Sequence, residues 1–496
     1  MQKKFLSNLI LILFLNLLVK PFYQLGIDRG VINAVGPSEY GIYFTIFNLT
    51  LVFNVLLDMG INNFNNRNIA QNAQLLAKHF SGIFVLRFLL GIIYLFVLTL
   101  VILSGKLQIK TEMLNLVLLM GVNQFLISLI LYLRSNISGL LLFKYDSFIS
   151  VLDRLILIGI VGYLLWFANM RQHFKIEWYV FAQTAAYLIT ALVAITIVLK
   201  NSGKIKFYFN LPFYLVIIKK SLPLATLILL MTFYTRADTL LINMILPSGE
   251  AEYQAGIYGA SNKLAEAGNN ILFLFSALLL PLFSKMIKEK LPVDEIIKLS
   301  TSIIFSGTII IAFASYFFRI EIMELLYNYK PNIETISEYH SKIAEMASSF
   351  PIFMISFIAI GGGYIFGTLL TANGSFKTLN YIAIPALLVS LILNLVLIPK
   401  YKVFGSAIAN ACAQYTILGL QLIITKKQFK FKIKRSTYFR FIGFLVGIII
   451  FGKIAVNLNY NWKLEISALL ILSILLANVL RLFSIKNFIT ILKMEQ

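Results

Sequence analysis

Long apolar runs, separated by short polar segments, follow one another along this entire chain. A bilayer core about 30 Å thick needs roughly 20 apolar residues in a helix, so each run is long enough to cross a membrane. The period-two alternation of a transmembrane barrel is absent, and we therefore expect the spans to be helical. The pattern predicts fourteen spans, at 6–33, 40–62, 82–103, 113–133, 148–168, 178–199, 221–246, 254–283, 298–318, 343–371, 379–398, 404–424, 439–457 and 464–482.

The composition also indicates an all-α integral membrane protein. Of the 496 residues, 59% are hydrophobic and 13% are charged, and the mean hydropathy is +0.85. Soluble domains average about 45–50% apolar and about 25% charged residues, so a soluble enzyme, a disordered chain and a disulfide scaffold are excluded. The single cysteine, Cys412, has no partner for an intramolecular disulfide, and the three histidines are too dispersed to hold zinc. We expect no metal site and no bound cofactor.

The distribution of the net charge of +22 predicts the orientation in the membrane. If the N-terminus lies inside, the inner segments hold more than twice as many Lys and Arg residues as the outer segments, which fits the positive-inside rule. Both termini are then cytoplasmic. The densest basic segment, 426–440, adjoins a helix end, so we expect it to contact anionic membrane lipids rather than nucleic acid.

The chain is expected to contain two related halves. The sequence Gly-Ile-Tyr occurs at 41–43, where the second span opens, and again at 256–258, where the eighth span opens. A six-helix unit repeated in parallel is a known plan of transporters. We therefore predict an N-lobe with six spans at 1–200, a basic cytoplasmic linker at 201–220, a C-lobe with six spans at 221–425, and a basic loop with two further spans at 426–496.

Four spans carry polar residues that recur every three or four positions, which places them on one face of a helix. Ionisable side chains at membrane depth are energetically unfavourable and are therefore functional candidates. These polar stripes contain Asn16, Lys20, Gln24 and Asp28, followed by Arg29, on the first span; Thr50, Asn54, Asp58 and Asn62 on the second; Thr232, Arg236, Thr239 and Asn243 on the seventh; and Lys263, Glu266 and Asn270 on the eighth.

Polar stripes also stabilise helix packing through hydrogen bonds, and Lys263 and Glu266 are spaced to neutralise each other. Arg87 and Arg154 lie near predicted cytoplasmic helix ends, where we expect them to pair or to extend toward the interface. Because the four striped spans are equivalent in the predicted repeat, we favour a water-filled cavity between the lobes. The candidate substrate-binding residues are Lys20, Gln24, Asp28, Arg29, Asn54, Asp58, Arg236, Asp238, Asn243, Lys263, Glu266 and Asn270.

No catalytic motif competes with this interpretation. A glycine-rich phosphate loop with its lysine is absent, and Gly361, Gly362 and Gly363 lie within an apolar span, where they favour close packing. A membrane glycosyltransferase is expected to have a large extramembrane loop or clustered carboxylates, and the sequence shows neither. We therefore predict a transporter rather than an enzyme, with no catalytic residues.

Three pairs of stretches resemble the polysaccharide-biosynthesis flippases, the Wzx-like O-antigen exporters of the multidrug/oligosaccharidyl-lipid/polysaccharide (MOP) superfamily. The third pair is the most specific for the superfamily. The stretches are Val35-Gly36-Pro37-Ser38-Glu39-Tyr40-Gly41 with Leu57-Asp58-Met59-Gly60-Ile61; Arg236-Ala237-Asp238 with Ala255-Gly256-Ile257-Tyr258; and Leu393-Asn394-Leu395-Val396-Leu397-Ile398-Pro399-Lys400-Tyr401 with Gly405-Ser406-Ala407-Ile408-Ala409-Asn410.

The resemblance implies a MATE-like fold with two pseudo-symmetric six-helix lobes, a central cavity lined by the four striped spans, and alternating access. It also implies the cargo, an undecaprenyl-pyrophosphate-linked oligosaccharide that crosses the bacterial cytoplasmic membrane toward the outer leaflet. Arginine suits the pyrophosphate, and Asn, Thr and Tyr suit the sugar. A polysaccharide polymerase and glycosyltransferases are the implied protein partners.

The charges of the candidate residues leave other functions open. Four cations are matched by as many acids, so some of the acids are candidates for binding protons or sodium ions that drive the cycle. A lipid II flippase and a cation-coupled drug exporter of the same superfamily are alternatives, and a membrane glycosyltransferase is a remote one. The cations are Lys20, Arg29, Arg236 and Lys263, and the acids are Asp28, Asp58, Asp238 and Glu266.

Overall fold

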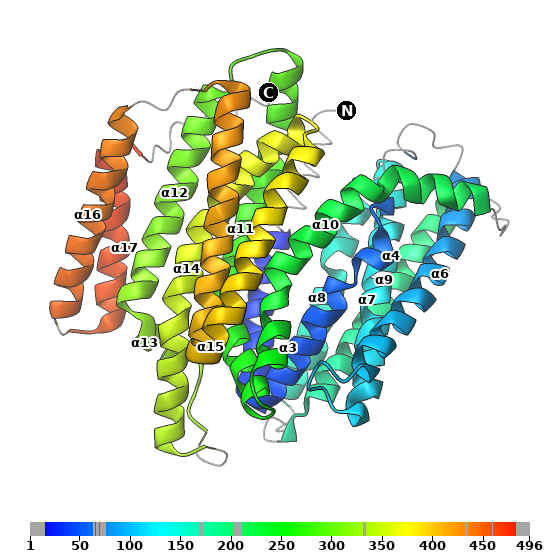
Figure 1. The fold of residues 1–496 in the computed structure, drawn as a ribbon, viewed down its shortest axis with the longest axis horizontal. Helices are drawn as coiled ribbons and strands as arrows, with labels where there is room; N and C mark the ends of the chain where they lie inside the picture. Colours follow the sequence, from blue (N-terminus) through cyan, green and yellow to red (C-terminus); the bar gives the residue numbers. More distant parts are fainter. Residues whose placement is uncertain are drawn as a thin grey trace. The chain divides into compact units, whose positions relative to one another are not determined.

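The computed structural model describes residues 15–62, 65, 69, 76–167, 173–202, 211–330, 334–431, 435–458 and 460–482. Within these ranges every regular element is helical and no strand occurs, as the hydropathy pattern predicts (Figure 1). Helices satisfy all their backbone polar groups internally, which a hydrocarbon environment requires. The start of the predicted first span and residues 203–210 of the predicted linker lie outside the described residues.

Twelve of the described helices are long and apolar enough to cross a membrane. One of them, α15 (Phe376–Phe429), has 54 residues and contains two predicted spans, because its backbone leaves the helical region at Lys402 (φ 51°, ψ −130°). The predicted first span is helical from residue 15 to residue 35 but begins outside the described residues. The described helices therefore agree with about fourteen crossings.

The turn inside α15 explains the most specific sequence motif. Ser406 Oγ donates a hydrogen bond of 2.8 Å to Asn394 Oδ1 across the turn, and both residues are fully buried. A Cβ atom at Gly405 would lie 2.6 Å from the Leu397 carbonyl oxygen, so this position accepts only glycine without a shift of the backbone. The motif thus builds a tight helical hairpin.

The contacts between residues divide the chain into two compact units, residues 1–259 and residues 260–496. The division falls within α11 (Glu250–Lys288), whereas the predicted C-lobe begins at residue 221. The first unit contains η1 (Tyr23–Asp28), α2 (Arg29–Val35), α3 (Pro37–Val52), α4 (Val55–Asp58), α6 (Leu76–Leu103), η3 (Thr111–Met113), α7 (Leu114–Gly139), α8 (Phe143–Trp166), α9 (Ile176–Ser202), α10 (Leu211–Ile245) and the first turns of α11.

Two glycines explain why the start of α11 belongs to the first unit. A Cβ at Gly41 on α3 would lie 1.8 Å from the Glu252 carbonyl oxygen, and a Cβ at Gly256 on α11 would lie 1.9 Å from the Pro37 carbonyl oxygen. The two Gly-Ile-Tyr sequences therefore mark a close contact between the two backbones. Their relation as a structural repeat, and the predicted lobe boundaries, stay predictions.

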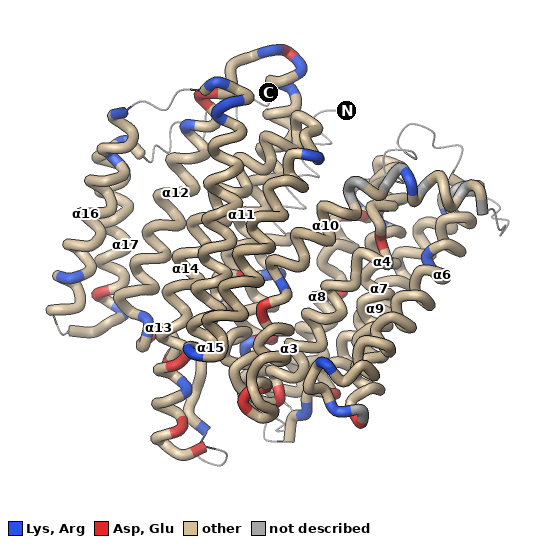
Figure 2. Tube along the Cα trace, viewed as in Figure 1, with Lys and Arg blue, Asp and Glu red and all other residues tan. Residues whose placement is uncertain are grey.

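The second unit places its last two helices beside α12 (Figure 1). Phe444 and Ile448 pack with Ile309, Ile310 and Ala477 in a buried apolar cluster. Charged positions lie mostly near the ends of its helices, and the middle segments are almost free of them, as expected of spans in a bilayer (Figure 2). The unit contains the rest of α11, α12 (Asp294–Phe317), α13 (Arg319–Leu326), α14 (Ile336–Ala372), α15, α16 (Arg435–Asn457) and α17 (Trp462–Val479).

Candidate functional site

The first span changes its helical geometry where its polar stripe reaches Asp28. Residues Tyr23–Asp28 form a π-helix, followed by the short α-helix α2, which ends at Gly36 with φ 87°. Short π-helical segments within α-helices are frequent at functional sites. The π-helix shifts the register of the side chains, so the i, i+4 spacing read from the sequence does not by itself fix the face that Asp28 occupies.

Asp28 lies in a cluster of buried tyrosines within the first unit. The hydroxyls of Tyr40 and Tyr179 donate to Asp28 Oδ1 at 3.4 and 3.3 Å. Tyr23 and Tyr179 are also hydrogen-bonded through their hydroxyls, and Gln183 Nε2 donates to the Tyr43 hydroxyl at 2.8 Å. The carboxylate is 8% exposed, so it is held at membrane depth by phenol donors.

The N-terminal part of the same stripe faces α8. Asn16 Nδ2 donates to Ser150 Oγ at 3.1 Å, and Lys20 lies one turn further along. The guanidinium of Arg154 lies over the Tyr23 ring, 4.8 Å from its centroid, and donates to the Tyr187 hydroxyl at 3.0 Å. The polar residues of the first span are therefore in contact with polar residues of α8, which in turn contact α9, all within the first unit.

The structure corrects the expected position of Arg154, although its expected pairing is confirmed, because its guanidinium lies 3.6 Å from Asp153 Oδ2. Helix α8 has 24 residues and begins at Phe143, five residues before the predicted span, so Arg154 occupies its twelfth position. It lies at the middle of the span rather than near the end. The sequence signal was hidden because Lys144 and Asp146 made the first turn of α8 resemble a loop.

Arg29, at the end of the π-helix, keeps an unsatisfied donor. Its Nε atom is buried and has no hydrogen-bond partner, and the described residues provide no ion pair for its guanidinium. Asn54 on the second span is similar, since its buried Oδ1 atom also has no partner in the described part of the chain. Buried polar atoms without partners are rare in native proteins, so both atoms are suited to a ligand or water.

Asp58 has a different environment, because it is paired. Its Oδ1 atom lies 2.6 Å from the Arg87 guanidinium, and Arg87 is 1% exposed. Arg87 also donates to the Leu57 carbonyl at 2.8 Å, to Ser128 Oγ at 2.5 Å and to Asn62 Oδ1 at 2.5 Å. The expectation that Arg87 pairs is confirmed, and the charge of Asp58 is compensated within the first unit.

The candidate residues on α10 divide into buried and half-buried groups. Asp238 is 1% exposed and accepts a hydrogen bond of 2.6 Å from the Tyr258 hydroxyl, while Arg236 is half-buried. Asn243 Oδ1 accepts from the backbone N–H of Gln108 at 2.9 Å, which holds the connection between α6 and α7. Asn243 therefore has a structural contact that accounts for its polarity.

The fourth set of candidates lies on α11 in the second unit. Lys263 Nζ is 3.2 Å from Glu266 Oε2, and Asn270 Nδ2 donates to the Glu266 carbonyl at 3.3 Å. The predicted mutual neutralisation of Lys263 and Glu266 is therefore seen. Within the ranges that the structure describes, no three His, Cys, Asp or Glu side chains gather as a metal site would require.

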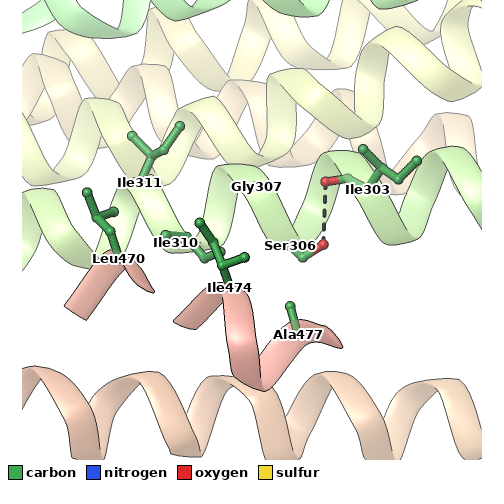
Figure 3. A pocket seen from close by; sticks show the side chains of 8 residues that line it. All are labelled: Ile303, Ser306, Gly307, Ile310, Ile311, Leu470, Ile474 and Ala477. Atoms are coloured by element: carbon green, nitrogen blue, oxygen red, sulfur yellow. Dashed lines mark hydrogen bonds between the residues drawn. The ribbon is translucent and has the colours of Figure 1, made fainter. Parts of the chain in front are cut away.

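The second unit also has an apolar cavity of about 360 Å³ between α12 and α17 (Figure 3). Ser306 has the one polar side chain among the lining residues, and its hydroxyl donates to the Ile303 carbonyl of its own helix at 3.4 Å. An apolar group such as a hydrocarbon chain can therefore pack against the cavity wall, whereas a polar group would lack a hydrogen-bond partner there. Its lining residues are Ile303, Ser306, Gly307, Ile310, Ile311, Leu470, Ile474 and Ala477.

Comparisons with known proteins bear on the family and the fold. The family model described as polysaccharide biosynthesis protein matches residues 8–287. No functionally curated protein matches the chain.

Several solved structures share the fold. The lipid II flippase MurJ in an inward closed conformation matches with a TM-score of 0.70 and 13% identity over 96% of this chain and 97% of MurJ. An inward-facing multidrug resistance MATE family transporter of the MOP superfamily matches with a TM-score of 0.63 and 12% identity. The match covers 85% of this chain and 98% of the transporter. The Vibrio cholerae MATE transporter VcmN in its bent form matches with a TM-score of 0.54 and 13% identity. The match covers 86% of this chain and 98% of VcmN. The expected MATE-like fold is confirmed, and family and fold are both of the transporter type.

Proposed function

Because the chain belongs to the polysaccharide biosynthesis protein family, we propose that it is a flippase for an undecaprenyl-pyrophosphate-linked oligosaccharide. It moves this lipid from the cytoplasmic to the outer leaflet of the bacterial cytoplasmic membrane by alternating access, for a surface polysaccharide such as O-antigen. Its partners are the glycosyltransferases that build the oligosaccharide and the polymerase that extends it. Both termini lie in the cytoplasm, in agreement with the positive-inside distribution of Lys and Arg.

The observation that carries this proposal is a group of incompletely compensated cations at membrane depth in the first unit. Lys20 has no ion pair or hydrogen bond to its ammonium group among the described residues, and the Arg29 Nε atom has no partner. Such groups are unfavourable in a bilayer unless water or an anionic ligand reaches them. A phosphate-bearing substrate supplies that anion.

The other parts of the cargo also find suitable groups. Tyrosine hydroxyls near Asp28, together with half-buried Gln24 and Asn54, provide donors and acceptors for sugar hydroxyls. The apolar cavity between α12 and α17 provides a surface for part of a polyprenyl chain, since hydrocarbon is stabilised there without any unsatisfied polar group. These features suit a lipid-linked sugar better than a small hydrophilic solute.

A lipid II flippase is the second candidate. The specific observation in its favour is the similarity to MurJ over 96% of this chain. Lipid II has the same chemical parts, a polyprenyl chain, a diphosphate and a sugar head, so the deep cations suit both substrates. A cation-coupled drug exporter would instead select apolar cations, which Lys20 and Arg154 repel.

The coupling ion is also proposed. Asp28 is a buried acid whose oxygen accepts from two tyrosines, and we assign it the proton or sodium ion that drives the cycle. Asp58 is less suited, because Arg87 already compensates its charge.

Transport in proteoliposomes tests the proposed function. The purified protein is reconstituted with a fluorescent lipid-linked oligosaccharide, with lipid II, and with a cationic drug in separate preparations. Transfer of the first lipid across the bilayer is expected to be fastest. Transfer of lipid II alone would replace the proposal with the second candidate, and incorporation of labelled sugar without transfer would indicate a glycosyltransferase.

A further inference from the structure

The second span is interrupted in its middle, where the sequence contains none of the residues that usually break a helix. Helix α3 ends at Val52, and α4 begins at Val55 after a turn at Phe53–Asn54. Helices kink mostly at proline, at glycine or serine, at π-helical turns, or where a side chain enters the ladder of backbone hydrogen bonds. Residues 42–59 contain no proline, glycine or serine, and the turn is not π-helical. An inserted side chain is therefore the remaining cause.

A tyrosine of α6 takes the place of the hydrogen bond that would continue the helix. In an α-helix the N–H of Asn54 would donate to the Thr50 carbonyl, four residues earlier. It donates instead to the Leu51 carbonyl at 3.1 Å, and the Thr50 carbonyl accepts from the Tyr94 hydroxyl at 2.9 Å. Tyr94 is fully buried, so its phenol competes with the backbone and favours the interrupted form of the span.

The turn has the hydrogen-bonding pattern of a hinge. The N–H groups of Leu56 and Leu57 donate to the carbonyls of Phe53 and Asn54, three residues earlier, at 2.9 Å. A 3₁₀ stretch in the middle of a helix often marks a functional hinge. The buried Asn54 Oδ1 atom has no partner in the part of the chain that the structure describes. This atom therefore does not hold the turn in its present form.

The two parts of the span are attached to different helices of the first unit. Helix α4 is bound to α6, because Arg87 contacts Asp58 at 2.6 Å and donates to the Leu57 carbonyl at 2.8 Å. Helix α3 packs against α10, and its Gly41 lies in close backbone contact with Gly256 on α11. A change in the turn would therefore redirect α3 and leave α4 in place on α6.

We propose that the turn at Phe53–Asn54 is a hinge, at which the second span changes between the interrupted helix of this structure and a continuous helix. Tyr94 is the positioning residue that stabilises the interrupted form, because its hydroxyl occupies the Thr50 carbonyl. When the phenol withdraws, the Asn54 N–H binds this carbonyl and α3 aligns with α4. The inference goes beyond the proposed function, since a two-state helix of this kind does not depend on the lipid that is carried.

Distances between pairs of spin labels in the full-length protein, reconstituted in nanodiscs, test the hinge by pulsed electron paramagnetic resonance. In a Cys412→Ser background, labels at the exposed positions Ser38 on α3 and Ile92 on α6 report the direction of α3 relative to α6. We expect two distances for this pair. The control pair is Ile92 with the exposed Leu131 on α7, which does not include α3 and should give one distance.

Tyr94→Phe tests the positioning role, since it removes one hydroxyl and retains the ring. It is expected to shift the populations about fivefold toward the second distance, as the loss of one hydrogen bond predicts. Tyr132→Phe is the matched control, because the Tyr132 hydroxyl is also buried and donates to a backbone carbonyl, that of Phe80 on α6, at 3.0 Å. The control should leave the populations unchanged.

Two substitutions of Asn54 test the change in the helix itself. Alanine favours a continuous helix and glycine disfavours it, by an amount that corresponds to about a fivefold difference in an equilibrium. Asn54→Ala should therefore increase the fraction of the second distance, and Asn54→Gly should decrease it. Thermal unfolding of each variant provides the check on folding.

The hinge is rejected if the Ser38–Ile92 pair gives one and the same distance in the wild type and in every folded variant, or if Tyr94→Phe and Tyr132→Phe shift the populations equally. The transport assay is read separately. Lipid transfer by a protein that shows a single distance removes the hinge and leaves the flippase intact. Two distances without any transfer by the wild type retain the hinge and reject the flippase.

Discussion

The guanidinium of Arg87 on α6 lies 2.6 Å from the carboxylate of Asp58, at the point where the second span is interrupted. Met59 and Gly60 follow with φ 43° and 76°, so the helix ends there. Arg87 also donates a hydrogen bond from its other terminal nitrogen to the Leu57 carbonyl, near the C-terminal end of α4. Substitution of Arg87 would therefore remove this bond as well as the ion pair. A cation at a helix C-terminus is favourable, and here Arg87 binds a carbonyl group at the end of α4.

Removal of either member of this pair is expected to destabilise the protein. Asp58→Leu leaves Arg87 as an uncompensated charge at 1% exposure, and breaking a buried pair in this way costs about 3–5 kcal/mol. The double variant Asp58→Leu with Arg87→Met is expected to lose less than the sum of the two single variants. Equilibrium unfolding in detergent measures all three. A double variant whose loss equals that sum would show that the pair is not coupled.

Substitution of the glycines at the contact between α3 and α11 is expected to prevent folding of the first unit. A Cβ at Gly41 or Gly256 would lie within 2 Å of a backbone oxygen of the other helix, which no side-chain movement relieves. Gly41→Ala and Gly256→Ala should therefore reduce the yield of folded protein from membranes. Gly159→Ala on α8 is the matched control, since nothing lies within 4 Å of its Cβ position. Normal yield for Gly41→Ala would contradict this packing.

Loss of the hydrogen bond across the turn of α15 is expected to have a moderate effect. Ser406→Ala removes the hydrogen bond to the fully buried Asn394 Oδ1 atom, and one such bond contributes about 0.5–1.5 kcal/mol. Thr416→Ala serves as control, because Thr416 is only half-buried and its hydroxyl donates to the Cys412 carbonyl of its own helix. Thermal unfolding should separate the two variants. Equal midpoints would indicate that the hairpin does not depend on this bond.

Asp28→Asn is expected to uncouple transport from its driving ion. The amide retains an oxygen that accepts from Tyr40 and Tyr179, so the fold should be preserved while the negative charge is lost. Transport in proteoliposomes should then no longer respond to a proton or sodium gradient. Glu324→Gln, at an exposed position of α13, is the control and should respond normally. A gradient response that persists in Asp28→Asn would assign the coupling ion to another acid.

The hydropathy pattern predicted the helical spans because membrane burial requires uninterrupted apolar runs, and these runs are local in the sequence. The two Gly-Ile-Tyr sequences could be recognised in the sequence, and their similarity suggested a repeat. The sequence did not predict that the backbones at the two glycines contact each other. The sequence predicted only part of the interaction between Arg87 and Asp58. The sequence indicated that Arg87 needs a partner but did not identify which acid lies within reach.

Arg154 shows where the sequence-based prediction failed. Charged residues in the first turn of α8 shifted the predicted start of the span, so a residue at the middle was placed near an end. The neighbours that give Arg154 its environment, Tyr23 and Tyr187, lie on two other helices. The sequence did not single out these tyrosines, because an aromatic side chain alone does not distinguish a packing role from a polar one.

The accessibility of introduced cysteines to a charged, membrane-impermeant thiol reagent tests most directly whether the polar stripes border a hydrated path. In a Cys412→Ser background, single cysteines replace Lys20, Gln24 and Arg236, and two lipid-facing controls replace Ile92 and Phe96, which are 66% and 62% exposed. The account predicts that the three stripe positions react clearly faster than both controls. Reaction of the stripe positions at the rate of the controls would contradict a water-filled route and, with it, the proposed transport.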